Sequence, residues 1–189
     1  MKSEDGSIAV LERALDQTGR IVAGVRPDQL GLATPCTEWD VRALTNHIVV
    51  DLLQFTASVR GDAWERPTAE VIGDDPAGDY RRAAAGLLAA WRDEGALDRK
   101  IELPGGAQVP AEWRLGQHVA DVVVHGWDLA SALGVQTELD PELARFSLDW
   151  GRENLRPEFR GRAFGPEVTA AEDAPLYERL AAFFGREPR

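Results

Sequence analysis

The sequence has little cysteine and no long apolar run. Its single cysteine, Cys36, rules out an internal disulfide and is typical of a reducing compartment. Residues 1–6 are polar and acidic, without the basic and apolar regions of a signal peptide. No stretch approaches the roughly 20 apolar residues that span a bilayer. We therefore expect a cytoplasmic protein that does not bind membranes.

Positive charge is also scarce. The 189 residues include 21 basic and 32 acidic side chains, for a formal net charge of -11. An acidic surface repels phosphate backbones and anionic lipid head groups, so nucleic acid is not an expected partner. The length suits one domain with its own core, and we expect residues 1–189 to form a single domain.

Several catalytic motifs are missing. The sequence contains no His-Glu-x-x-His pair, no glycine-rich phosphate loop and no Gly-x-Ser-x-Gly turn. These absences argue against a zinc protease, a nucleotide-binding enzyme and a serine hydrolase of the usual kinds.

What the sequence does contain is a series of amphipathic helical segments. Apolar residues at helical spacing predict helices over 8–25, 76–94, 112–133, 142–154 and 176–184. A further helix is expected to be capped by Thr37, with Asp40 completing a capping box, and to end at Gly61. We expect a short hairpin or extended loop at residues 101–103 and 108–109. We expect an irregular arm, packed on the helices, at residues 157–174. The pattern predicts an all-α protein built on a four-helix bundle.

The three histidines provide the main chemical signal. His118, Asp121 and His125 fall within an arc of about 60° on one predicted helix, at the edge of its apolar stripe. Asp121 and His125 are four residues apart, a spacing that lets one helix hold one metal ion. His47 lies at the edge of another apolar stripe and is the remaining histidine. Catalytic zinc sites typically use three protein ligands and leave one position open.

Other interpretations of these residues stay open. A histidine at a helix edge is often a surface or capping group, and an aspartate four residues away can simply hydrogen-bond to it. Cys36 precedes a helix, where its pKa can be lowered for a nucleophilic role. It can equally serve as a small apolar plug beside Trp39.

Three segments resemble a known family. They are Pro35-Cys-Thr-Glu-Trp-Asp-Val-Arg-Ala-Leu-Thr-Asn-His47, His118-Val-Ala-Asp-Val-Val-Val-His-Gly-Trp-Asp-Leu-Ala130, and the ending from Phe164 to Arg186. Together they are similar to the DinB-like superfamily, in its actinobacterial branch near the N-terminal domain of mycothiol-dependent maleylpyruvate isomerase. The resemblance implies a DinB-like bundle and a divalent metal, zinc or nickel, held by His47, Asp121 and His125. Relatives carry His or Glu where this chain has the shorter Asp121.

The resemblance leaves two functions to be separated. In the first, the metal holds mycothiol or a similar low-molecular-weight thiol, which attacks an electrophilic substrate in a transferase or isomerase reaction. His118 and Asp128 would then orient ligands or move a proton, and Arg114 would meet an anionic substrate unless it forms a surface salt bridge. The second is a non-catalytic metal- or ligand-binding protein. A metal-dependent hydrolase is disfavoured because no glutamate lies beside the ligand pair. The expected partners are small molecules, and a homodimer is left open.

Overall fold

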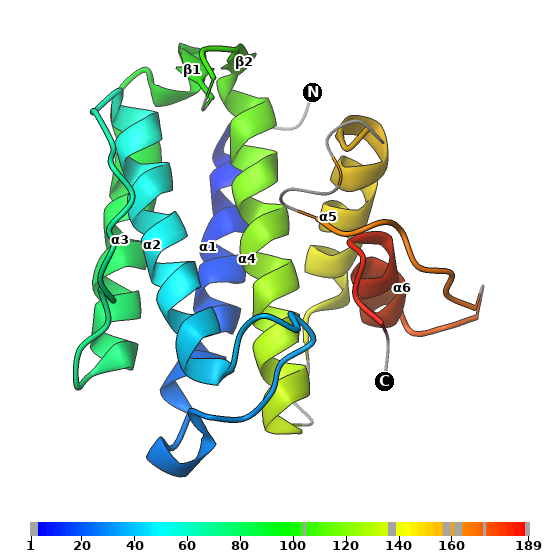
Figure 1. The fold of residues 1–189 in the computed structure, drawn as a ribbon. Helices are drawn as coiled ribbons and strands as arrows, with labels where there is room; N and C mark the ends of the chain where they lie inside the picture. The colour runs from blue at the N-terminus through cyan, green and yellow to red at the C-terminus, as the bar shows by residue number, and fades with distance from the viewer. Residues whose placement is uncertain are drawn as a thin grey trace.

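Four long helices form the body of the computed structural model, which describes residues 4–103, 105–135, 139–156, 160, 164–171 and 173–187. These helices are α1 (Glu4–Ala23), α2 (Val41–Arg60), α3 (Pro76–Arg92) and α4 (Ala111–Leu133). Two short 3-10 helices lie at Pro27–Gln29 and Ala96–Asp98. Two shorter helices, α5 (Pro141–Asn154) and α6 (Leu176–Phe183), lie to one side of the bundle against α4 (Figure 1). The expected all-α four-helix bundle is therefore confirmed.

Capping side chains, prolines and glycines set the ends of several helices. At the start of α2, the Asp40 carboxylate accepts a hydrogen bond from the amide of Ala43 at 2.8 Å. Asp40 is thus the capping residue itself, and the expectation that Thr37 caps the helix was wrong by three residues. Asp-Pro pairs open both α3 and α5, where proline occupies a position that needs no amide donor. Gly61 ends α2 in a left-handed conformation, with φ 76°.

A short hairpin connects α3 to α4. Strands β1 (Lys100–Glu102) and β2 (Gln108–Pro110) pair antiparallel, with Ile101 opposite Val109. This confirms the expected hairpin; Pro104 in its turn lies outside the described residues. The hairpin lies at the end of the bundle where α2 finishes and α4 begins (Figure 1). It helps to form a cavity there.

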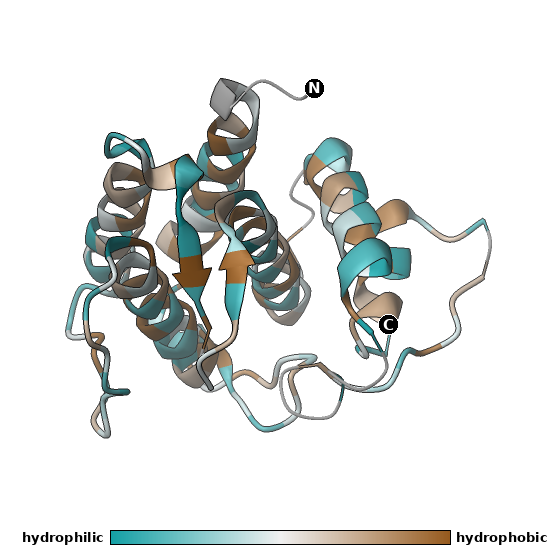
Figure 2. Ribbon diagram, turned by 90° about the horizontal axis from the view of Figure 1, so that it is seen from above, coloured by the Kyte–Doolittle hydropathy of each residue, from teal (hydrophilic) through white to brown (hydrophobic). Residues whose placement is uncertain are grey.

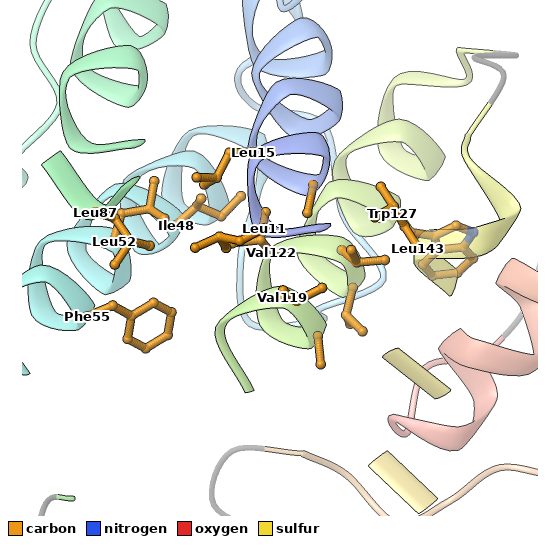
Figure 3. Packing of buried hydrophobic residues seen from close by; sticks show 14 of the residues in the cluster. Leu11, Leu15, Ile48, Leu52, Phe55, Leu87, Val119, Val122, Trp127 and Leu143 are labelled. Carbon is orange, nitrogen blue, oxygen red and sulfur yellow. The ribbon is translucent and has the colours of Figure 1, made fainter. Parts of the chain in front are cut away.

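The core is continuous across the bundle and its side helices. Leu11 of α1, Leu52 of α2 and Val119 of α4 are completely buried (Figure 3). Leu143 of α5 and Leu180 of α6 belong to the same buried cluster. Seen from above, α5 and α6 form a separate layer beside the four helices (Figure 2). Parts of the expected C-terminal arm, residues 157–159, 161–163 and 172, lie outside the described residues. None of the described helices has the length and apolar content needed to cross a membrane.

Helix α1 approaches α4 closely at Gly126, next to His125. A Cβ added there would lie 2.5 Å from Oγ1 of Thr18, a buried residue that donates to the carbonyl of Val122. Gly126→Ala is expected to lower the free energy of unfolding by about 1–3 kcal/mol, because overpacking outweighs the better helix propensity of alanine. Gly86→Ala in α3 is the matched control. Its added Cβ meets nothing closer than 4.0 Å, so stability is expected to rise by about 0.5–1 kcal/mol. Denaturant unfolding measures the free energy of unfolding of both variants. Equal changes in the two variants would contradict the close approach of α1 to α4 at Gly126.

Candidate functional site

His47 of α2 and His125 of α4 face each other across the bundle. Their ring centroids are 4.9 Å apart, with the rings nearly perpendicular. The indole of Trp39, from the loop before α2, lies 4.1 Å from the His47 ring. Both histidines line a cavity of about 630 Å³, which is closed by that loop on one side and by the C-terminal arm at Phe164 and Arg186 on another. The polar edges of α2 and α4 therefore meet at this cavity.

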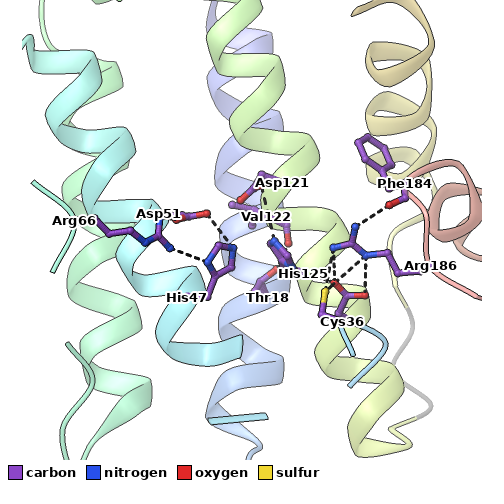
Figure 4. Close-up of polar contacts among 11 residues, drawn as sticks. Thr18, Cys36, His47, Asp51, Arg66, Asp121, Val122, His125, Phe184 and Arg186 are labelled. Atoms are coloured by element: carbon purple, nitrogen blue, oxygen red, sulfur yellow. Dashed lines mark hydrogen bonds and ion pairs between the residues drawn. The ribbon is translucent and has the colours of Figure 1, made fainter. Parts of the chain in front are cut away.

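His125 is held by two carboxylates. Its Nδ1 donates to Oδ2 of Asp128 at 3.1 Å, and its Nε2 lies 3.9 Å from Oδ1 of Asp121 (Figure 4). Burial alone would lower the pKa of His125. Hydrogen bonds with Asp128 and Cys36 and the nearby negative charges outweigh burial and raise that pKa to about 10. Asp128 therefore orients the ring, and Nε2, the nitrogen turned toward Asp121, carries a proton at neutral pH that a bound metal would displace.

His47 has a partner at each ring nitrogen. Its Nε2 lies 3.1 Å from Oδ2 of Asp51, one turn further along α2, and its Nδ1 lies 3.0 Å from Nη2 of Arg66. Burial, followed by the positive charges of His125 and Arg66, lowers the pKa of His47 to about 3. The ring is therefore neutral at physiological pH, which is the form that binds metals.

The cavity also holds two carboxylates, Asp51, which lies 3.3 Å from Nη1 of Arg66, and Asp121. Burial raises the pKa of Asp51 to about 7, helped by the negative charge of Asp121. Burial likewise raises the pKa of Asp121. A divalent cation between these groups would favour their charged forms. Sequence reasoning missed Asp51, although His47 and Asp51 repeat the four-residue spacing of Asp121 and His125.

Asp128 anchors a buried ion pair that extends to the C-terminal arm. Its Oδ2 lies 3.0 Å from Nη2 of Arg186, and both side chains are buried. The same Arg186 nitrogen lies 3.2 Å from Sγ of Cys36, which in turn lies 3.1 Å from Oδ2 of Asp128. Cys36 thus belongs to a charged cluster and is not the apolar plug beside Trp39 that was one of the two expectations. The arm is tied to α4 and to the loop before α2 through Arg186.

Two sets of donor atoms can be compared as metal ligands. Among the described residues, the donors that all lie within 4.8 Å of one another belong to Cys36, His125 and Asp128. That cluster already contains a cation, because the Arg186 guanidinium contacts both Cys36 and Asp128. The groups around His47, Asp121 and His125 are set more widely, and here the Arg66 guanidinium contacts only Nδ1 of His47 among the three. The donor types at this second set, imidazole and carboxylate, fit zinc or nickel.

His118 lies apart from this cavity. It is completely buried, its Nδ1 accepts a hydrogen bond from Nε1 of Trp91 at 3.2 Å, and its ring stacks on Phe55 at 3.9 Å. The sequence expectation placed it in contact with the metal site because it shares a helical face with His125. Seven residues, however, separate the two by about 10 Å along the helix axis. We therefore give His118 no catalytic role.

Arg114 lies still further along α4. Its side chain is only 3% exposed and lines a different cavity, beneath the hairpin. Among the described residues no carboxylate lies within 4.0 Å of its guanidinium, so it is not the surface salt bridge that was the alternative expectation. Arg66 lines this second cavity and also contacts His47, so the two cavities are neighbours.

The bundle, the small hairpin and the paired histidines define a DinB-like fold. Residues 11–130 match the family model described as the mycothiol maleylpyruvate isomerase N-terminal domain, and the chain belongs to that family. Two curated proteins of Mycobacterium tuberculosis, uncharacterized protein MT0763 (strain CDC 1551 / Oshkosh) and uncharacterized protein Rv0738 (strain ATCC 25618 / H37Rv), are 36% identical to it. Each match covers 94% of this chain and 96% of the relative.

Solved structures agree on the fold. Crystal structures of the mycothiol-dependent maleylpyruvate isomerase and of a mutant of that enzyme superpose with TM-scores of 0.60 and 0.62. In both cases the match covers 76% of this chain and 67% of the other, at 16% sequence identity. At that identity the likeness supports a common fold and leaves the activity to be argued from the site.

Proposed function

We propose that this protein binds a divalent metal through His47, Asp121 and His125, and uses it in a mycothiol-type thiol transferase or isomerase reaction. The observation that carries the proposal is the contact between Asp128 and Nδ1 of His125. A metal-binding histidine usually donates its second ring N–H to a carboxylate, which fixes the ring and strengthens the ligand. Here that contact leaves Nε2 of His125 turned toward Asp121 and the facing His47 ring.

Each residue then has a defined task. A bound divalent metal would lower the pKa of a coordinated thiol, so that the thiolate is present at neutral pH. Asp128 positions His125, and Arg186 in turn neutralises Asp128. Trp39 packs against His47 and restricts its ring. The C-terminal arm contributes Phe164 and Arg186 to the lining of the cavity. Family membership supports mycothiol as the thiol.

A second candidate is a metal- or ligand-binding protein without turnover. One observation favours it: both ring nitrogens of His47 already have partners, Asp51 and Arg66. Binding a metal through this ring requires one of these contacts to break, which weakens the metal's hold. Asp121 is shorter than the His or Glu of relatives, and this also weakens the expected metal binding.

Metal analysis combined with a thiol-transfer assay separates the candidates. Zinc and nickel are measured per chain in the purified protein, which is then given mycothiol and an electrophilic aryl halide. Bound metal with consumption of mycothiol above the uncatalysed rate is the result expected for the proposed function. Bound metal without consumption contradicts the transferase reaction. If the protein takes up neither metal when supplied with both, the proposed function and metal binding by the second candidate fail together.

A further inference from the structure

A cavity of about 860 Å³ lies at the hairpin end of the bundle. It is formed by the end of α2, the loop that follows, the hairpin and the first turn of α4. Five of its lining residues are basic and only two are acidic, in a chain whose net charge is -11. The basic residues are Arg60, Arg66, Arg99, Lys100 and Arg114. Such a concentration of positive charge makes the cavity attractive to anions.

Arg114 is the decisive side chain in this cavity. It is 3% exposed, its Nη1 donates to the side chain of Gln117, and its guanidinium lies 5.2 Å from the Phe55 ring centroid. Its buried Nε has no hydrogen-bond partner among the described residues. Burial lowers the pKa of Arg114 to about 10, so the group remains charged at neutral pH. The more distant charges of Asp121 and Asp51 offset this burial only in part, and an anion in contact with the guanidinium would lower the remaining cost.

A second unpartnered donor lines the same cavity. The indole Nε1 of Trp64, in the loop after α2, is buried and has no acceptor among the described residues. Buried N–H groups are nearly always hydrogen-bonded in folded proteins, so two unsatisfied donors on one cavity are a specific signal. Both groups donate and neither accepts. The complementary ligand is an acceptor that carries negative charge.

We propose that this cavity binds a small organic acid, with its carboxylate between Arg114 and Trp64. A planar guanidinium matches the two oxygens of a carboxylate, and the indole N–H adds a third donor. Arg66 lines this cavity and contacts His47 in the neighbouring one. Arg114 lies 11 residues before His125, about 16 Å along the axis of α4, so an acid bound here occupies a site separate from the candidate metal site.

Succinate is a suitable probe, with succinamide as its neutral analogue and inorganic phosphate as the other anion. Binding to the full chain is followed by calorimetry and by thermal unfolding at constant ionic strength. Succinate is expected to bind and to raise the unfolding temperature, whereas succinamide is not. Arg114→Gln is expected to weaken succinate binding by about 10-fold or more, because a charge-assisted hydrogen bond is lost. Arg20→Gln, on the exposed face of α1, is the matched control and is expected to bind succinate normally.

Two further variants keep the test decisive. Trp64→Phe retains the ring but removes the indole N–H, and is expected to weaken succinate binding even if Arg114→Gln fails to fold. His125→Ala removes a proposed metal ligand and is expected to leave succinate binding intact, which separates this inference from the metal site. The proposal is overturned if succinamide binds as well as succinate, or if Arg114→Gln and Trp64→Phe both bind succinate like the wild type. Tighter Arg114-dependent binding of phosphate than of succinate would overturn the assignment of a carboxylate.

Discussion

His125→Ala is expected to lower the affinity for zinc or nickel by more than about 100-fold. Removing a residue that only orients a metal ligand costs about 10–100-fold, so removing a ligand costs more. His47 and Asp121 alone would hold a divalent ion poorly, because a protein zinc site normally needs three ligands or more. The measurement is a competition titration against a chromogenic chelator, with circular dichroism to show that the helices remain.

His118→Gln provides the control for that experiment. It removes a histidine from the same helix, two turns away, where the ring contacts Trp91 and Phe55 and does not line the cavity. Metal affinity is expected to stay within a few-fold of the wild type, although stability falls because a buried ring is replaced. A loss of metal in this variant comparable to that in His125→Ala would contradict the separation of the two sites along α4.

Asp128→Asn is expected to produce the largest loss of stability, about 3–5 kcal/mol. The substitution leaves Arg186 buried without its ionic partner, and breaking a buried pair by removing one member costs roughly that amount. It also replaces the carboxylate that accepts the His125 Nδ1–H bond by a neutral amide, so metal affinity is expected to fall by about 10–100-fold. Denaturant unfolding of the metal-free protein measures the first effect, and the chelator titration measures the second.

The double variant Asp128→Asn with Arg186→Met tests whether the unpaired charge of Arg186 causes this loss of stability. With the guanidinium gone, no unpaired positive charge remains, so the double variant is expected to be less destabilised than the sum of the two single variants. Simple additivity would indicate that Asp128 and Arg186 do not interact in solution as they do in the structure.

Local features of this fold could be predicted from the sequence. Apolar residues at helical spacing identified the helices, and the Asp-Pro pairs and glycines identified most of their ends. The sequence also indicates that His47 and His125 lie near the buried interior, because each stands at the edge of an apolar stripe that must be buried. Thr37 was mistaken for a cap because both it and Asp40 have capping side chains. Only the backbone conformation distinguishes the two.

The rest of the site depends on long-range packing. Arg186 reaches Cys36 across 150 residues of sequence, and no local pattern predicts which loop an arm will cover. His118 was misjudged because an angular projection ignores the rise along the helix axis. Asp51 was within reach of sequence reasoning, since it stands four residues after His47 on the same face. Arg114 was expected to meet an anion, and its place in a separate cavity followed only from the position of the hairpin.

A crystal of the zinc-soaked protein, with anomalous scattering recorded at the zinc edge, tests the central claim most directly. The account predicts one strong peak between His47, Asp121 and His125, with Asp128 still bonded to Nδ1 of His125. A peak between Cys36, His125 and Asp128, with Arg186 displaced, would contradict the proposed ligand set. So would a protein that holds zinc only at other surface positions.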